Sequence, residues 1–171
     1  MIELGVNSVL FGDFNFATAC KHIKLANYDG IEVSAIKGMC EHLVLDEWEK
    51  QGKEVKHIAE DNGLKLLSME VASLDEDRLT KAFEAGAALG IPIINVGPGG
   101  KSDVREDLER SIAQLKKMSE KAENYGVTLC VKAHVGSAIY NTPTMLYAID
   151  KIDSPAFGLD MDPSHIYRVG E

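Results

Sequence analysis

The chain has few cysteines and lacks a run of apolar residues long enough to cross a membrane. Its three cysteines, Cys20, Cys40 and Cys130, are odd in number and show no CxxC spacing, which argues against a disulfide framework and a structural zinc site. No segment approaches the roughly 18 apolar residues of a membrane span, and the N-terminal sequence lacks the basic and apolar regions of a secretion signal. We therefore expect a cytoplasmic protein without a membrane partner.

Positive charge is also scarce. The sequence contains 18 Lys and Arg residues against 27 Asp and Glu residues, which gives a formal net charge of −9. Because affinity for a phosphate backbone comes largely from clustered Lys and Arg, this balance argues against a nucleic-acid partner. The hydrophobic fraction of 45% and the length of 171 residues are typical of a soluble globular protein. We expect a single domain over residues 1–171.

Glycines divide the chain into repeated units. Four stretches with helical character end at a glycine that β-forming residues follow directly: Gly30, Gly63, Gly90 and Gly126. Glycine commonly ends helices because it adopts a left-handed backbone at little cost. The pattern predicts strands at about 2–8, 31–36, 64–71, 91–97, 127–134 and 156–162. Strands that alternate with helices predict an α/β protein with a parallel sheet and crossover helices.

Two helix starts have their own signals. Asp103 followed by Glu106 has the spacing of an N-cap pair, which predicts the start of the helix with the clearest apolar periodicity. Thr142 before Pro143 predicts another helix start, because proline fits the first turn of a helix. Weaker periodic patterns predict helices at about 15–27, 46–61, 75–89 and 142–152.

An open doubly wound sheet and a closed barrel both fit this alternation, and side-chain parity separates them. Residues 127–134 place Lys132 and His134 on one face and apolar residues on the other. In residues 64–71 we assign Leu67 and Met69 to the apolar face and Ser68 and Glu70 to the polar face. Each polar face becomes more polar toward the C-terminal end of its strand, which is where barrel enzymes of the TIM type build active sites. We favour a parallel (β/α) barrel of this type.

The barrel is expected to be incomplete. An eight-stranded barrel typically needs about 250 residues, whereas this chain ends shortly after its sixth predicted strand, so about six of eight strand–helix units are present. We therefore expect one barrel domain that is truncated after the sixth strand. Its first and last strands would have free edges, which favours a homo-oligomer that covers them.

Several segments together resemble a known family. They are YDGIEVSA at 28–35, ALGIPIINVGPGG at 88–100, GVTLCVKAHVG at 126–136 and the stretch from NTPT to the DPSH motif at 162–165. They resemble the sugar phosphate isomerase/epimerase superfamily, which has xylose isomerase-like TIM barrels. The resemblance implies a carbohydrate enzyme that moves a proton next to a carbonyl through an enediolate. It also implies a divalent metal, Mn, Mg or Zn, held by a glutamate, an aspartate, a histidine and a glutamate on strands five to eight.

Carried onto this sequence, the resemblance implies that Asp162 is the metal aspartate and that His165 binds a substrate oxygen. Lys132 lies where the first metal glutamate is expected, and a cation there repels a metal. We therefore do not expect this chain to hold the metal firmly. Three interpretations of Lys132 stay open: an ion pair with Asp160 or Asp162, a contact to a substrate phosphate or carboxylate, or a Schiff base, which requires a lowered pKa.

The remaining candidates each have a structural alternative. Glu32 is a candidate catalytic residue or an ion-pair partner of Lys132, and His134 is a candidate catalytic acid or a histidine bonded to a loop carbonyl. Glu70 and Asn95 either contact substrate or only form hydrogen bonds inside the mouth of the barrel. Lys101, in GPGGKSD, either binds a substrate anion or belongs to a plain connection. The favoured function is a sugar or sugar-phosphate isomerase or epimerase, and the alternative is a non-catalytic or degenerate barrel fragment that binds a small polyol or anion.

Overall fold

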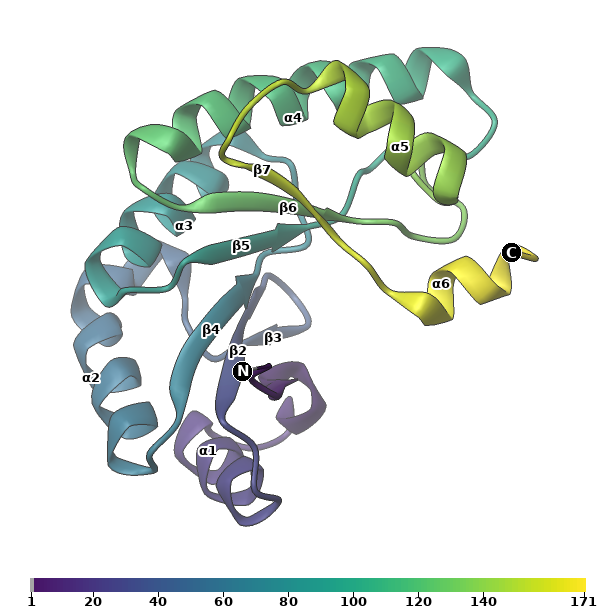
Figure 1. The fold of residues 1–171 in the computed structure, drawn as a ribbon. Helices are drawn as coiled ribbons and strands as arrows, with labels where there is room; N and C mark the ends of the chain where they lie inside the picture. Colours follow the sequence, from purple (N-terminus) through teal and green to yellow (C-terminus); the bar gives the residue numbers. More distant parts are fainter. Residues whose placement is uncertain (1) are drawn as a thin grey trace.

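The computed structural model describes residues 2–171 and shows a curved sheet whose convex side is covered by helices (Figure 1). The strands are β1 (Gly5–Asn7), β2 (Gly30–Ile36), β3 (Cys40–Glu41), β4 (Lys65–Glu70), β5 (Ile93–Val96), β6 (Thr128–Lys132) and β7 (Phe157–Asp160). The helices are α1 (Phe16–Leu25), α2 (Trp48–Asp61), α3 (Glu76–Leu89), α4 (Arg105–Asn124), α5 (Thr142–Lys151) and α6 (Pro163–Arg168), with short 3-10 turns η1 (Ser8–Phe11) and η2 (Leu45–Glu47).

The strand order is that of a barrel wall that has not closed. Strands β1, β2, β4, β5, β6 and β7 follow one another in parallel, and β1 and β7 lie at the two ends of this order. The short strand β3, which the sequence pattern did not predict, pairs antiparallel with β2. The predicted α/β class, parallel topology and TIM-type arrangement are confirmed. None of the helices among residues 2–171 is both long and apolar enough to span a membrane.

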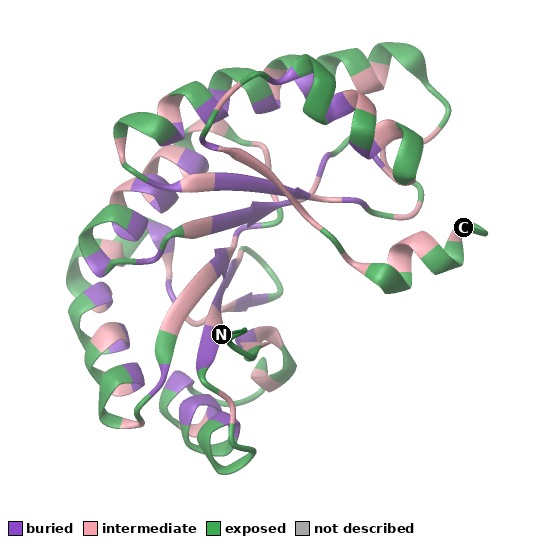
Figure 2. Ribbon diagram, in the orientation of Figure 1, coloured by how far each residue is buried: buried purple, intermediate pink, exposed green. Residues whose placement is uncertain are grey.

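The hydrophobic core lies between the convex face of the sheet and helices α1 to α5 (Figure 2). Ile31, Ile94 and Leu129 are fully or almost fully buried there, each on a different strand. Ile94 pairs with Leu129 in the sheet, and Ile31 lies on the same face of β2 as Val33, which pairs with Met69 next to Ile94. Because side chains alternate along a strand, these apolar residues face the helices and the residues between them face the concave side. The predicted side-chain parity of the fifth predicted strand is confirmed.

One assignment of side-chain direction was wrong. The register between β2 and β4 shifts after Ile31, which pairs with Leu66, so that Glu32 pairs with Ser68 and Leu67 is an extra residue. This bulge reverses the expected direction of Leu67. Leu66 packs against the helix-side core, whereas Leu67 faces the concave side of the sheet, where it lines a cavity.

The glycines were interpreted correctly at three of four positions. Gly63, Gly90 and Gly126 have φ values of +63°, +78° and +68°, as expected for residues that follow helices. Gly30 instead lies within β2, and Asn27 adopts the left-handed conformation after α1, with φ of +65°. A Cβ atom at Gly30 would lie 2.5 Å from Leu67 Cγ and 2.7 Å from the Lys65 carbonyl oxygen. Gly30 is therefore required because the bulged side chain lies directly against it.

The two predicted helix starts differ in outcome. The Asp103 cap was wrong, because α4 begins after Val104 without a side-chain cap, and Asp103 accepts a hydrogen bond from the Tyr140 hydroxyl at 2.6 Å. The start near Thr142 is confirmed with the cap one residue earlier. Asn141 accepts the Thr144 N–H and forms a reciprocal capping box with that residue.

Candidate active site

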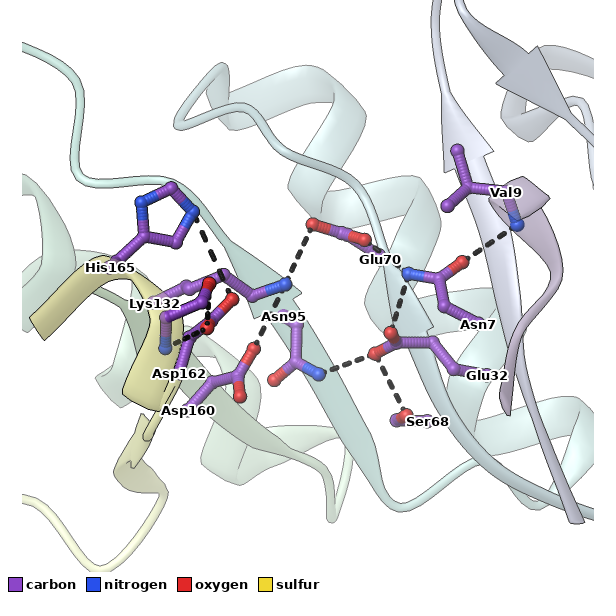
Figure 3. Close-up of polar contacts among 11 residues, drawn as sticks. Asn7, Val9, Glu32, Ser68, Glu70, Asn95, Lys132, Asp160, Asp162 and His165 are labelled. Carbon is purple, nitrogen blue, oxygen red and sulfur yellow. Dashed lines mark hydrogen bonds and ion pairs between the residues drawn. The ribbon is translucent and has the colours of Figure 1, made fainter. Parts of the chain in front are cut away.

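Polar side chains from six parallel strands or the segments that follow them gather on the concave side of the sheet (Figure 3). They surround a cavity of about 280 Å³, called the mouth cavity here, which is lined by Gly5, Asn7, Glu32, Leu67, Ser68, Asn95, Lys132 and Asp160. A larger groove of about 560 Å³ runs along α4, but its Asp107 and Arg110 side chains pair with each other. The mouth cavity therefore combines two carboxylates, a lysine and two amide side chains with the position expected of a barrel active site.

Glu32 is held by donors from three other strands. Asn7 Nδ2 donates to Glu32 Oε2 at 2.6 Å, and it also donates to Glu70 Oε2. Ser68 Oγ at 2.9 Å and Asn95 Nδ2 at 2.5 Å both donate to Glu32 Oε1. Burial raises the pKa of Glu32, and the hydrogen bond from Asn95 opposes this effect. The carboxylate is thus fixed in place while its affinity for a proton is increased.

Lys132 on β6 lies between the carboxylates of Glu70, two strands away on β4, and Asp160, on the adjacent strand β7. Its Nζ atom is 3.3 Å from Glu70 Oε1 and 3.4 Å from Asp160 Oδ2. Burial alone would lower the pKa of Lys132, but Glu70, Asp160 and Glu32 together raise it above its ordinary value. Burial also raises the pKa of Asp160, against the attraction of Lys132. This geometry favours the ion-pair interpretation of Lys132, because a Schiff base requires a neutral amine.

Two histidines lie beside the cavity. The rings of His134 and His165 have their centroids 4.1 Å apart and are tilted by 37° to each other, and His165 Nδ1 accepts the Val135 N–H at 3.3 Å. Burial lowers the pKa of His165, as does the neighbouring His134. His134 itself is exposed and directs Nδ1 toward the Val135 carbonyl at 3.0 Å. His165 therefore joins α6 to the segment after β6, and His134 lies outside the cavity lining.

Asp162 is engaged at the start of α6. Its Oδ1 atom accepts the Ser164 N–H at 3.0 Å and the Ser164 hydroxyl at 2.6 Å, and these bonds lower the pKa of Asp162. Its Oδ2 atom lies 3.8 Å from His165 Nε2. The side chain thus serves as a helix cap as well as a neighbour of the cavity.

The structure brings together some of the predicted site residues and separates others. Glu32, Asn95 and Lys132 line the mouth cavity, and Glu70 joins them through its ion pair. Lys101 does not join them. It is exposed, and its backbone N–H donates to Asp107 Oδ2 at 2.8 Å, so a carboxylate of the protein already occupies the position where an anion would bind.

Sequence reasoning missed Asn7 and Ser68, and it treated Asp160 only as a partner for Lys132. All three line the mouth cavity. Asn7 is polar at the end of the first predicted strand, which is the same signal that identified Glu70 and Asn95. Ser68 lies on the same predicted polar face as Glu70, but parity could not reveal its pairing with Glu32, because the bulge at Leu67 that sets this pairing has no sequence signature.

Comparison with known families identifies the fold. Residues 20–171 match the family described as xylose isomerase-like TIM barrel. The chain belongs to this family. The resemblance stated from the sequence is therefore confirmed at the level of the family. No curated protein sequence matches the chain.

Solved structures of the same fold span a longer chain. The probable 3-DHS dehydratase AsbF of Bacillus anthracis has a TM-score of 0.79 and 14% identity, and D-psicose 3-epimerase, solved in the presence of D-fructose, has a TM-score of 0.79 and 15% identity. The IOLI protein, solved with a bound zinc atom, has a TM-score of 0.78 and 18% identity. This chain is covered to 99% in each case and spans 66% of the length of each of these structures. At such identities the likeness establishes the fold.

The donor groups present do not fit the divalent metal that the xylose isomerase-like family implies. Within residues 2–171, no group of three or more His, Cys, Asp or Glu side chains is arranged to hold a metal ion. The ammonium of Lys132 lies among the carboxylates that would otherwise be available, and Asp162 directs one oxygen to the backbone of α6. A hard cation requires several free oxygen ligands around one point, and this arrangement supplies a positive charge there instead.

Proposed function

We propose that this chain provides the mouth of a sugar or sugar-phosphate isomerase or epimerase, which moves a proton next to a carbonyl through an enediolate. One observation supports this most strongly: a charged lysine lies among three carboxylates at the C-terminal ends of parallel strands. The fold is shared with D-psicose 3-epimerase, which is a sugar epimerase by name. We also propose that residues 1–171 act as one domain.

Lys132 is proposed to stabilise the negative oxygen of the enediolate. An ammonium has three N–H donors, and the two ion pairs with Glu70 and Asp160 leave one of them for a substrate oxygen. When a proton leaves the carbon beside the carbonyl, the C–H electron pair forms a C=C bond and the carbonyl oxygen becomes negative. A fixed positive charge in a partly buried position stabilises that oxygen more than it stabilises the neutral carbonyl.

Glu32 is proposed to accept and return the proton. Its raised pKa brings it closer to neutrality, where a general base is most effective. A carboxylate offers about four lone-pair positions, and the three donors of Asn7, Ser68 and Asn95 leave one of them free. Return of the proton to the opposite face of the carbon gives an epimer, and its delivery to the adjacent carbon gives an isomer.

The other site residues are assigned supporting roles. Glu70 positions Lys132, and Asn95 and His165 are proposed to bind substrate hydroxyls. A catalytic role for His134 and an anion contact for Lys101 stay predictions, because neither side chain lines the mouth cavity. Divalent metal occurs in the fold, since the IOLI structure holds zinc. In this chain we propose that Lys132 supplies the positive charge in place of Asp162 and a metal.

Solvent proton exchange tests this function directly. D-fructose is incubated with the protein in D₂O that contains a chelator, and NMR follows the loss of the C–H signal beside the carbonyl. We expect exchange above the buffer rate in the wild type, and roughly 100-fold slower exchange in Lys132→Met and in Glu32→Gln. Wild-type exchange at the buffer rate, or exchange that neither substitution slows, would contradict the proposal.

A non-catalytic polyol-binding role is the second candidate, and one observation favours it. Each carboxylate oxygen of Glu32 and Glu70 already has a partner within the protein, so the network is satisfied without a ligand. Such satisfied networks are also found where polar groups only stabilise an interior. Binding of a polyol without any proton exchange would select this function.

A further inference from the structure

The mouth cavity has an excess of negative charge. The single ammonium of Lys132 is surrounded by the carboxylates of Glu32, Glu70 and Asp160, and it forms ion pairs with two of them. Its charge is therefore shared before any ligand arrives. A phosphate in this cavity would face more carboxylates than cations, and the partly buried setting strengthens that repulsion.

Among residues 2–171, no other Lys or Arg side chain lines the mouth cavity to offset this charge. Lys101 is exposed and does not line the cavity. Two amides of the glycine-rich segment 97–103 are used internally, since the Lys101 N–H donates to Asp107 and the Ser102 N–H donates to the Gly136 carbonyl at 3.1 Å. Neither the Lys101 ammonium nor these two amides are therefore placed to bind a phosphate in the mouth cavity.

Asn95 provides an independent indication of the ligand. The residue is only 8% exposed, and its Oδ1 atom is buried without a hydrogen-bond donor. Its orientation is fixed, because Nδ2 donates to Glu32 at 2.5 Å and a flipped amide would place an oxygen against that carboxylate. In Figure 3 the amide oxygen points away from Glu32, toward the side where Asp160 lies. A buried acceptor without a donor is unfavourable, and a donor from a ligand would relieve this cost.

We propose that the mouth cavity binds an uncharged, polyhydroxylated sugar in preference to a sugar phosphate, and that Asn95 selects it by accepting a hydrogen bond from a sugar hydroxyl. Hydroxyl groups fit both observations, because each can donate to a carboxylate or to Asn95 without adding negative charge. Because Oδ1 is buried, this contact requires the side chains that cover it to move when the sugar binds. The choice of a sugar as ligand rests on the proposed function, whereas the preference for a neutral ligand rests on charge.

Binding of D-glucitol and D-glucitol 6-phosphate to the wild-type chain tests the preference. Neither compound has a carbonyl, so neither can undergo the proposed proton transfer, and binding is measured separately from catalysis. Titration calorimetry at low salt should show affinity roughly tenfold higher or more for D-glucitol, with a smaller difference at high salt. Equal or tighter binding of the phosphate, or no binding of either compound, would overturn the inference. D-glucitol binding without proton exchange would refute the proposed function alone.

A matched pair of variants tests the role of Asn95. Asn95→Ala and Ser68→Ala each remove one hydrogen bond to Glu32 Oε1, but only the first also removes the free acceptor. We expect D-glucitol affinity to fall roughly fivefold further in Asn95→Ala than in Ser68→Ala. Circular dichroism establishes that both variants are folded, and the wild-type comparison stands without them. Equal losses would show that Asn95 acts only by holding Glu32, and this would overturn its selecting role.

Discussion

Replacement of Lys132 by methionine removes the one Lys or Arg side chain that, within residues 2–171, lines the mouth cavity. At 3.3 Å and an effective dielectric constant near 20, the attraction to Glu70 amounts to about 5 kcal/mol, and the attraction to Asp160 is similar. Desolvation of the ammonium offsets much of this gain. Loss of one partner from a buried pair typically costs about 3–5 kcal/mol. The side chains of Lys132, Glu70 and Asp160 stay 21%, 15% and 26% exposed, so we expect a loss of about 3 kcal/mol.

Thermal unfolding measures this loss. For a chain of this size, about 3 kcal/mol lowers Tm by roughly 6–12 °C. Lys37→Met is the matched control, because Lys37 is 66% exposed and lies 3.9 Å from Asp46 in a surface pair that contributes about 1 kcal/mol or less. Circular dichroism of both variants at neutral pH gives the comparison. If Lys132→Met were as stable as the wild type, the lysine would not neutralise the cluster and the electrostatic reasoning would be refuted.

The same variant should respond to pH in a defined direction. Lys132 holds down the pKa of Asp160, so without it the pKa of Asp160 in the folded protein rises further and folding favours its protonated form. The deficit relative to wild type should therefore be largest at neutral pH and shrink as the pH falls and Asp160 takes up a proton. A deficit that stays constant from neutral to acidic pH would indicate that lost packing of the lysine stem, rather than lost charge, causes the effect.

Further predictions concern metal, packing, capping and assembly. Lys132→Glu should bind Mn²⁺ more tightly than the wild type in calorimetry, and equal weak binding would argue that the position is not part of a latent metal site. Gly30→Ala should destabilise the fold by about 2–3 kcal/mol in urea unfolding, because its Cβ would lie 2.7 Å from a backbone carbonyl, and a neutral effect would contradict the close contact with Leu67. Asn141→Ala should cost about 1 kcal/mol through loss of the α5 capping box, measured in the same way, and no change would mean that the cap is not formed in solution. Light scattering should give a mass above the 18.7 kDa of one chain, because β1 and β7 have free edges, and a stable monomer would show that these edges need no partner.

The strands and the polar end of the sheet could be predicted because side-chain alternation survives in the sequence. Glu32, Asn95 and Lys132 each follow apolar neighbours with the period of a strand, and the structure places all three around one cavity. Parity reports only which face a residue occupies. It could not reveal that Asn7 bridges Glu32 and Glu70, because that contact joins residues that are 25 and 63 positions apart.

Loop geometry was the part that local patterns failed to predict. Asp103 and Glu106 have the spacing of a helix cap, but Asp103 takes a left-handed conformation and bonds to Tyr140 instead. The glycine-rich segment before it suggested an anion site, yet Asp107 from the following helix satisfies its amide. In both cases a residue outside the motif competes successfully for the same hydrogen-bonding group, and nothing within the motif records that competitor.

The extra residue at Leu67 interrupts the alternation of side chains along β4. After it, Ser68 and Glu70 lie on the cavity side while Met69 between them is buried in the core. The additional residue is accommodated where Leu67 meets Gly30, and beyond it Glu32 pairs with Ser68 and Ser34 with Glu70. The placement of two cavity-side residues on β4 thus depends on a glycine at the start of the adjacent strand β2.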